Sequence, residues 1–396
     1  MSLKRLALVL LVVAAVLVPA TTASARRYPA RPRLSLVPLQ TAQLGSAGAS
    51  LALNYGSGPL PKDGLTLPLL GGYVNYDVTY PYPIVPRPVA GYALDYGDPL
   101  TGSAGVTAIR TSVEKYTSAA DAKHGLKFWR RGQPQLADFN SSVLSATTTW
   151  LTRPTVGQNG FASLFTVGAA NLNPIVRLDE QVTDGRYLLD VTITAGSASA
   201  AEQAAPGLLK ALDRRLHHVL GGHWVGGPAT LPKPPEAGQA QGGPDLSAVT
   251  LQLSDLGQSH WVSLDQDYDA SPFALSSFHM TALPAGPYSY LHQSIAWWPS
   301  ATEATYADAY QGEFLASVYS AYEGATVTPV DLSALSDPAY GALITGSEAG
   351  TSVVVINLTN GQADDRVHAV SDSVLTPTDV QSLAQAAATR LDAALP

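Results

Sequence analysis

The feature that most constrains the fold of this chain is an internal repeat. Residues 34–45 read LSLVPLQTAQLG and residues 246–257 read LSAVTLQLSDLG, identical at seven of twelve positions and 212 residues apart. A second match, SAAD at 118–121 with SATE at 300–303, has an offset of 182. Both tetrapeptides have the serine and the acidic residue that cap the first turn of a helix. The chain therefore reads as two copies of one domain.

Each copy is expected to end in an amphipathic helix. Apolar side chains recur at helical intervals from Ala205 to Leu220 and, 175 residues later, from Val380 to Leu395. This spacing places them on one helix face. Short β-rich runs precede each helix, at 161–167, 188–194, 353–358 and 366–370. We predict an α+β fold class: two tandem duplicated domains, each a mainly antiparallel sheet with helices packed on one face.

Glycine and proline mark the domain boundaries. Twelve of the 24 residues from 221 to 244 are Gly or Pro, a composition typical of a linker. We therefore assign 34–221 to the first domain, 222–245 to the linker and 246–396 to the second domain.

A stretch rich in tyrosine and proline, 56–97, is interpreted as an insertion in the first domain that the second copy lacks. Tyrosine rings stack on sugars and peptides, and prolines order a loop in advance. Tyr76, Tyr80 and Tyr82 are therefore candidate ligand-binding residues. The alternative is that the insertion only packs on the surface of its own domain.

The N-terminus has the pattern of an export signal. An uncharged apolar run at 6–18 follows two basic residues, and Ala-Ser-Ala at 23–25 suits signal peptidase. We expect residues 1–25 to be removed after Ala25, which predicts a secreted protein, extracellular or associated with the cell wall. A retained anchor is the alternative. A lipoprotein is excluded because acylation needs a cysteine.

Charge is distributed unevenly along the rest of the chain. The segment 26–33 is a basic arm that contains Arg26, Arg27, Arg31 and Arg33. Such an arm can contact an anionic membrane surface or an acidic wall polymer, or remain solvated. Residues 26–232 carry 18 basic and 13 acidic side chains, whereas residues 233–396 carry 3 and 18. An acidic second half argues against a nucleic-acid partner.

Composition and motifs exclude several classes of protein. The chain has no cysteine, which excludes a disulfide scaffold, an iron–sulfur cluster and a zinc site built on thiolates. Its hydrophobic share of 46% is too high for a disordered chain. The G-x-S-x-G motif of serine hydrolases does not occur. The sequence thus indicates no catalytic residues and no cofactor.

Two groups of residues resemble metal ligands. His217, His218 and His223 lie at the end of the first closing helix, and imidazole is a common ligand of zinc, nickel and copper. Adjacent helical residues point about 100° apart, and the Gly-Gly pair at 221–222 ends the helix before His223. Histidines near a helix C-terminus also interact favourably with the helix dipole. We therefore predict no metal site among them.

The second group is Asp265, Asp267 and Asp269, which resemble the start of a calcium loop. Such a loop needs glycine at its sixth position and glutamate at its twelfth, where this chain has Ala270 and Ser276. We interpret the three aspartates as exposed acidic turn residues.

The order of elements in each copy supports a resemblance. An opening such as 246–257, a helix led by 300–303, strands and a closing helix resemble the extracytoplasmic sensor-like domains of actinobacteria and related Gram-positive bacteria. Some of these form the outer part of mycobacterial receptor serine/threonine kinases. The resemblance implies an antiparallel sheet with flanking helices and a non-catalytic, ligand-binding or interaction role. The chain departs from the kinase ectodomains because it has no disulfide and no kinase follows.

Export, duplication and the lack of a catalytic motif favour a secreted, non-enzymatic protein of the bacterial envelope. The alternative is a secreted hydrolase with an unrecognised active site between the domains, near one of His217, His260, His279, His292 and His368. A third hypothesis is an envelope spacer that binds no small ligand.

Overall fold

The structure is a computed structural model of the chain. It describes residues 33–54, 57–60, 88–97, 105–131, 144–152, 155–169, 174–223, 226–233, 237–258, 260–269, 274–284, 287–305, 307, 326–332, 334–335, 339–346 and 352–395. The predicted export signal and its cleavage site at Ala25 lie outside these ranges. Within them, no helix is long and apolar enough to cross a membrane.

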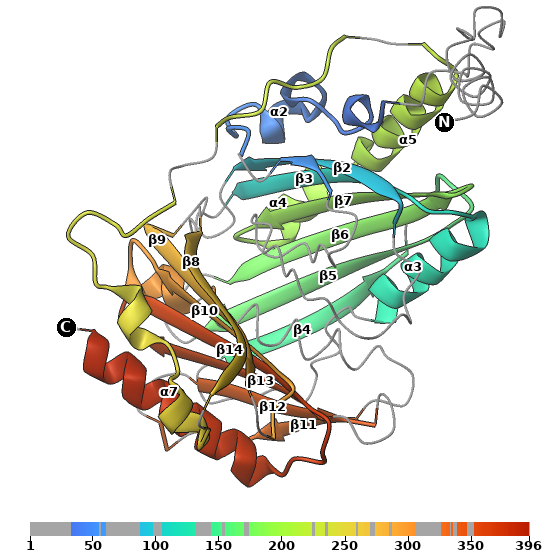
Figure 1. Ribbon diagram of the computed structural model, residues 1–396. Helices are drawn as coiled ribbons and strands as arrows, with labels where there is room; N and C mark the ends of the chain where they lie inside the picture. The colour runs from blue at the N-terminus through green and yellow to red at the C-terminus, as the bar shows by residue number, and fades with distance from the viewer. Residues whose placement is uncertain are drawn as a thin grey trace, which may run out of the picture. The chain divides into compact units, whose positions relative to one another are not determined.

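The first half of the chain forms a seven-stranded antiparallel sheet of order β1-β2-β3-β7-β6-β5-β4 (Figure 1). Its strands are β1 (Gly58–Pro59), β2 (Ala90–Gly97), β3 (Val106–Lys115), β4 (Leu144–Leu151), β5 (Asn159–Ala169), β6 (Ile175–Asp184) and β7 (Tyr187–Ala195). Its helical segments are η1 (Leu34–Leu36), η2 (Thr41–Gln43), α2 (Gly45–Gly48), α3 (Ala119–Arg131), α4 (Ala198–Ala204) and α5 (Leu208–Leu220).

The second half forms a seven-stranded antiparallel sheet of order β11-β12-β13-β14-β10-β9-β8. Its strands are β8 (Trp261–Asp269), β9 (Ser276–Pro284), β10 (Tyr290–Trp297), β11 (Thr326–Val330), β12 (Ala339–Thr345), β13 (Ser352–Asn360) and β14 (Ala363–Ser371). Its helical segments include η3 (Leu246–Val249), η4 (Leu253–Leu256) and α7 (Pro377–Ala394). Read from β8, this order repeats that of the first sheet strand by strand. The predicted fold class, α+β with two similar antiparallel domains, is confirmed.

The repeated opening segments are attached to their sheets in the same way. The main-chain N–H of Leu39 donates to Thr111 Oγ1 on β3 at 3.0 Å. In the second copy the N–H of Leu251 donates to Gln293 Oε1 on β10 at 2.8 Å. These pairs are separated by the offsets of 212 and 182 that the sequence shows. The two openings are therefore structural equivalents.

The closing helices also contact these openings at matching positions. Arg215 on α5 donates from Nη1 to Gln43 Oε1 at 2.8 Å. Arg390, 175 residues later on α7, donates from Nε to Asp255 Oδ2 at 2.9 Å. A guanidinium group thus holds the opening against the last helix in each copy.

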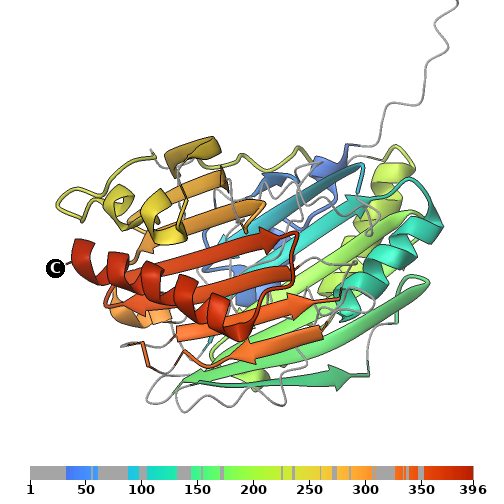
Figure 2. The ribbon, with the colours of Figure 1, turned by 60° about the horizontal axis from the view of Figure 1, so that its bottom comes forward.

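The two cores have corresponding centres. Leu216 on α5 is fully buried, and Leu391 on α7 is 2% exposed. Each belongs to the apolar cluster between its helix and its own sheet. Figure 2 shows α7 lying along the second sheet. Both apolar spacings were predicted from the sequence, and both place one helix face in a core.

The hairpins β6–β7 and β13–β14 turn at matching glycines. Gly185 has φ 54 and Gly361 has φ 56, values in the left-handed region that glycine adopts without a Cβ clash. The residues before them are Asp184 and Asn360, so the turns are of the Asp-Gly and Asn-Gly kinds that favour tight hairpins.

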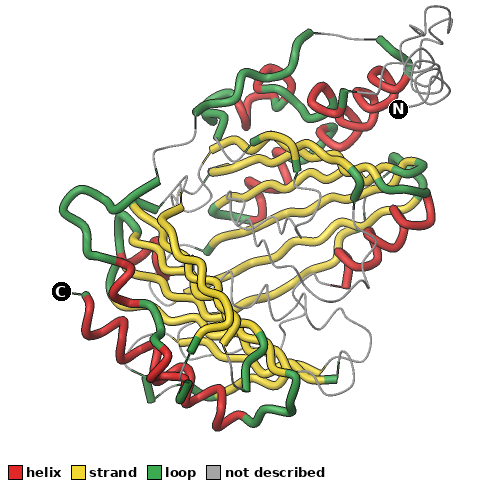
Figure 3. The backbone as a smooth tube through the Cα atoms, in the orientation of Figure 1, coloured by secondary structure: helices red, strands yellow, loops and turns green. Residues whose placement is uncertain are grey.

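Helix α3 is an exception to the one-sided arrangement that we predicted. The Tyr116 hydroxyl donates to Glu114 Oε2 at 2.7 Å, and a Cβ at Gly125 of α3 would lie 2.5 Å from that hydroxyl. Val113, which neighbours Glu114 on β3, belongs to the core under α4 and α5. Because strand side chains alternate between faces, α3 packs on the opposite face. Figure 3 shows helices on both sides of this sheet.

The segment that we interpret as an insertion, 56–97, contains two strands of the sheet. β1 and β2 lie at its ends and take the places that β8 and β9 take in the second sheet. The residues between them, 61–87, lie outside the described ranges.

Candidate functional site

The residues proposed from the sequence as ligand contacts fall outside the structural description. Tyr76, Tyr80 and Tyr82 belong to the segment 61–87. Arg26, Arg27 and Arg31 precede the first described residue, and Arg33 is exposed. These residues therefore remain predictions.

A row of ionisable side chains crosses the second sheet on the face opposite α7. His279, His292 and His368 lie on β9, β10 and β14, with His292 directly opposite His368. The imidazoles of His279 and His292 are stacked, with centroids 6.4 Å apart and planes 21° apart. The strand neighbours Met280 and Val367 belong to the core under α7, which places the histidines on the other face.

Three aspartates of β8 extend this row. Asp267 is directly opposite His279. Asp269 Oδ2 lies 2.9 Å from His279 Nδ1, and Asp265 Oδ2 lies 3.9 Å from His279 Nε2. We call these three aspartates with His279, His292 and His368 the histidine face. The interpretation of the aspartates as turn residues is wrong: their alternation along an edge strand, rather than a turn, directs them to one side.

The histidines of this face differ in their affinity for protons. The hydrogen bond from Asp269 raises the pKa of His279, and the nearby β8 carboxylates act in the same direction against burial. Burial lowers the pKa of His292 to about 4 and that of His368 to about 3, and a neighbouring imidazole adds to each effect. Positive charge on this face is thus confined to the end nearest β8.

One pair on the histidine face has the composition of a nucleophile and its base. Thr281 Oγ1 lies 2.9 Å from His292 Nδ1. A general base works best when its pKa lies near the working pH, and that of His292 is about 4. The pair is therefore poorly suited to the hydrolase that we considered as an alternative.

The corresponding face of the first sheet has different chemistry. Arg110 is opposite Thr192, in the positions that His292 and His368 occupy in the second copy. The buried ionisable residues here, which we call the carboxylate face, are Asp95, Arg110, Glu114, Arg177, Asp179 and Asp190.

Two carboxyl groups of the carboxylate face are strongly perturbed. Burial raises the pKa of Asp190 to about 7, and the carboxylate of Asp179 adds to the effect. Burial also raises the pKa of Asp95 to about 6, against the attraction of Arg110. Asp179 is instead paired, with Arg177 Nη2 at 2.6 Å from its Oδ2. Such perturbed groups are enriched at functional sites, although structural networks also produce them.

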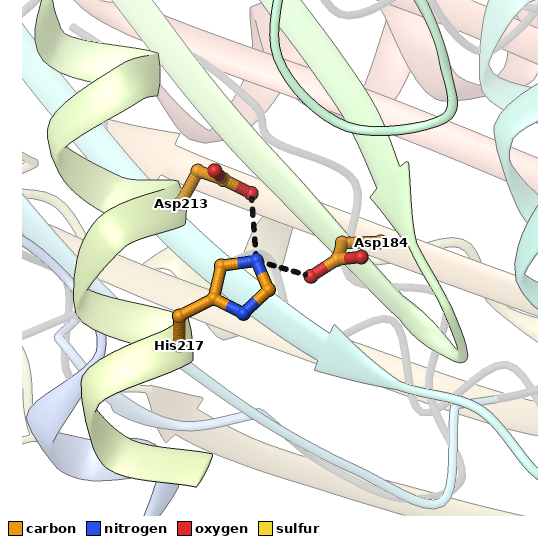
Figure 4. Close-up of side chains that lie close together, drawn as sticks. All are labelled: Asp184, Asp213 and His217. Carbon is orange, nitrogen blue, oxygen red and sulfur yellow. Dashed lines mark ion pairs between the residues drawn. The ribbon is translucent and has the colours of Figure 1, made fainter. Parts of the chain in front are cut away.

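A third cluster lies where the β6–β7 hairpin meets α5 (Figure 4). His217 Nε2 is 3.0 Å from Asp184 Oδ2, which comes from the end of β6, and 4.0 Å from Asp213 Oδ1, one helical turn earlier on α5. One ligand atom from each of the three residues lies within 4.8 Å of the others. The His217 side chain is 61% exposed, whereas those of Asp184 and Asp213 are 21% and 16% exposed.

Sequence reasoning grouped His217 with the wrong partners. The ring of His223 lies near that of His218, with centroids 6.5 Å apart, and neither belongs to the cluster of Figure 4. The i, i+4 spacing of Asp213 and His217 was a signal in the sequence that could have been used. Asp184 could not be found in this way, because only the tertiary fold brings the hairpin to α5.

Comparison with known proteins adds little. A scan of protein-family models and a search of curated proteins both give no match. Among solved structures, the crystal structure of the extracellular domain of PknH from Mycobacterium tuberculosis matches with a TM-score of 0.29 and 12% sequence identity, covering 37% of this chain and 94% of that chain. This weak likeness is consistent with the sensor-like resemblance, and at this TM-score it does not assign a function.

Proposed function

We propose that this chain is a secreted, non-enzymatic protein of the bacterial envelope, and that it acts as a ligand-binding or interaction module of two sensor-like domains. The observation that carries the proposal is the contrast between the two faces of each sheet. The face under the closing helix is matched between the copies, and the opposite face is not.

The matched face is apolar and structural. Leu216 and Leu391 fill corresponding places in the two cores, and Arg215 and Arg390 hold corresponding openings. A duplicated frame keeps such contacts because losing them costs stability in either copy.

The opposite face has changed its charge at equivalent positions. Arg110 and Thr192 of the carboxylate face correspond to His292 and His368 of the histidine face. One frame that presents two unlike polar surfaces is suited to binding two unlike partners, because function depends on the groups placed on a fold rather than on the fold.

The most exposed part of these surfaces is the β8 edge. The side chains of Asp265 and Asp269 are 80% and 56% exposed, and His279 lies beside them. We therefore expect the histidine face to contact its partner first through β8, by charge and hydrogen bonds.

The proposal is tested by binding to purified cell-wall material at low and high salt, with the chain lacking residues 1–25. Retention on the wall supports binding, and loss of retention at high salt implicates charged contacts. Two variants separate the sources: a joint replacement of the four arginines of 26–33 by serine, and Asp265→Asn combined with Asp269→Asn.

Three results would contradict the proposal. Binding neither to wall material nor to lipid vesicles favours the spacer. Release of soluble wall fragments by the wild-type chain and not by Thr281→Val favours the hydrolase. Wall retention that both variants leave unchanged at every salt concentration shows that neither surface is used.

A further inference from the structure

The cluster at Asp184, Asp213 and His217 contains an acceptor that the protein leaves unsatisfied. Asp213 Oδ1 is buried and accepts no hydrogen bond. Desolvation raises the pKa of Asp213, the attraction of His217 opposes this, and the carboxylate of Asp184 raises the pKa further. A buried carboxylate oxygen without a partner is costly, and two neighbouring carboxylates favour a bound cation.

The second copy shows what the same location needs for structure alone. The equivalents of Asp184 and His217 are Asn360 and Asp392, at offsets of 176 and 175. Asn360 Nδ2 donates to Asp392 Oδ1 at 2.9 Å, which joins hairpin to helix by one hydrogen bond. The equivalent of Asp213 is Ala388. The first copy therefore carries one carboxylate more than this attachment requires.

The spacing of the three ligand atoms suits a small metal ion. Zinc lies about 2.0–2.2 Å from nitrogen and oxygen ligands, so ligand atoms in a tetrahedral site are about 3.3 Å apart. The distances from His217 Nε2, 3.0 Å to Asp184 and 4.0 Å to Asp213, lie on either side of this value. Rotation of the exposed His217 side chain is enough to equalise them.

We propose that Asp184, Asp213 and His217 form a binding site for a divalent transition-metal ion of the zinc class. The imidazole nitrogen selects against calcium and magnesium, which prefer oxygen ligands. Three protein ligands leave a fourth position open to water or to a group from a partner. The proposal is independent of the proposed function, although an open position on an envelope protein is a place where a partner can be held.

Isothermal titration with zinc chloride tests the proposal on the chain lacking residues 1–25, dialysed free of metal. We expect one equivalent of zinc with a dissociation constant in the micromolar range or below. His217→Ala and Asp213→Asn are each expected to weaken binding at least tenfold. Affinity should also fall at acid pH, because zinc and a proton compete for Nε2.

Two matched controls make the test specific. Joint replacement of His218 and His223 by alanine, and Asp392→Asn in the second copy, should each leave the zinc affinity unchanged within twofold. Circular dichroism and the thermal midpoint of metal-free Asp213→Asn should match the wild type, so that lost binding is not lost folding.

The proposal is overturned by any of three results: no measurable zinc binding, binding retained by both His217→Ala and Asp213→Asn, or equal affinity for calcium. Zinc binding abolished by the His218 and His223 replacement would likewise assign the metal to the helix terminus instead. None of these results bears on wall binding, so the two proposals fail independently.

Discussion

Replacing Asp365 by asparagine is expected to remove a large pH dependence from the stability of the second domain. Asp365 is fully buried on β14, where Gln293 Nε2 donates to both of its carboxyl oxygens at 3.0 and 2.9 Å. Gln293 Oε1 is occupied by the N–H of Leu251, which fixes the orientation of the amide. Burial raises the pKa of Asp365 to about 8, although the Gln293 hydrogen bond acts in the opposite direction.

The expected magnitude follows from this pKa. The ordinary aspartate value is 3.8, so between pH 3.8 and 8 the unfolded chain releases a proton that the folded chain keeps. The stabilisation is complete below the lower value and is lost as the pH rises through the upper one, at about 1.4 kcal/mol per pH unit. Between pH 5 and pH 7 the free energy of unfolding should fall by about 2.7 kcal/mol through Asp365 alone.

Guanidinium denaturation followed by circular dichroism at pH 5, 6 and 7 measures this effect. Asp365→Asn preserves the shape and the hydrogen bond to Gln293 but cannot titrate, so its stability should lack the decline. The difference between wild type and variant cancels the contributions of Asp95 and Asp190, which are present in both. If the two proteins show parallel pH dependence, the reasoning about Asp365 is refuted.

Three further predictions concern matched or neighbouring positions. Leu216→Ala and Leu391→Ala should each lower the free energy of unfolding by about 3–5 kcal/mol in guanidinium denaturation, because both side chains are buried; a loss below about 1 kcal/mol for either contradicts the matched packing. Asp269→Asn should lower the pKa of His279, because the Asp269 hydrogen bond is the main cause of its elevation; an unchanged NMR titration of His279 would count against this. Arg215→Ala should destabilise the chain more than Arg390→Ala, by roughly 1 kcal/mol, because Arg215 Nε donates to the carbonyls of Leu36 and Val37, whereas the Arg390 ion pair is partly exposed; equal thermal midpoints would refute that ranking.

The duplication and the fold class could be predicted from the sequence because they depend on local patterns. The opening motif and the capping residues require particular side chains at fixed spacings. Ser118 Oγ accepts from the N–H of Asp121 at 3.1 Å, and Ser300 Oγ accepts from the N–H of Glu303 at 3.2 Å. Such local contacts leave a trace that survives in both copies.

Strand lengths were harder to predict because buried charges interrupt the apolar pattern. The run at 366–370 lies within β14, which begins at Ala363 and includes the buried Asp364 and Asp365. β8 was missed as a strand because its aspartates resemble a loop. In each case a polar residue occupies a strand position for reasons that only its tertiary neighbours explain.

The polar faces and the cluster of Figure 4 depend on strand order. β3 pairs with β7 and β10 pairs with β14, and these strands are far apart in the sequence. Hydrophobic periodicity shows which residues share a face of one strand, but not which strands are neighbours. The row of His279, His292 and His368 therefore could not be predicted.

The central claim, that one fold occurs twice in this chain, is tested most directly by disulfide trapping, since the chain has no cysteine of its own. Lys115 is opposite Tyr187 and Trp297 is opposite Ala363, and both pairs lie next to hydrogen-bonded pairs, in the closer spacing that suits a disulfide. Lys115→Cys with Tyr187→Cys, and separately Trp297→Cys with Ala363→Cys, should each cross-link on mild oxidation in the folded chain. Cross-linking in one copy and not in the other would contradict the claim.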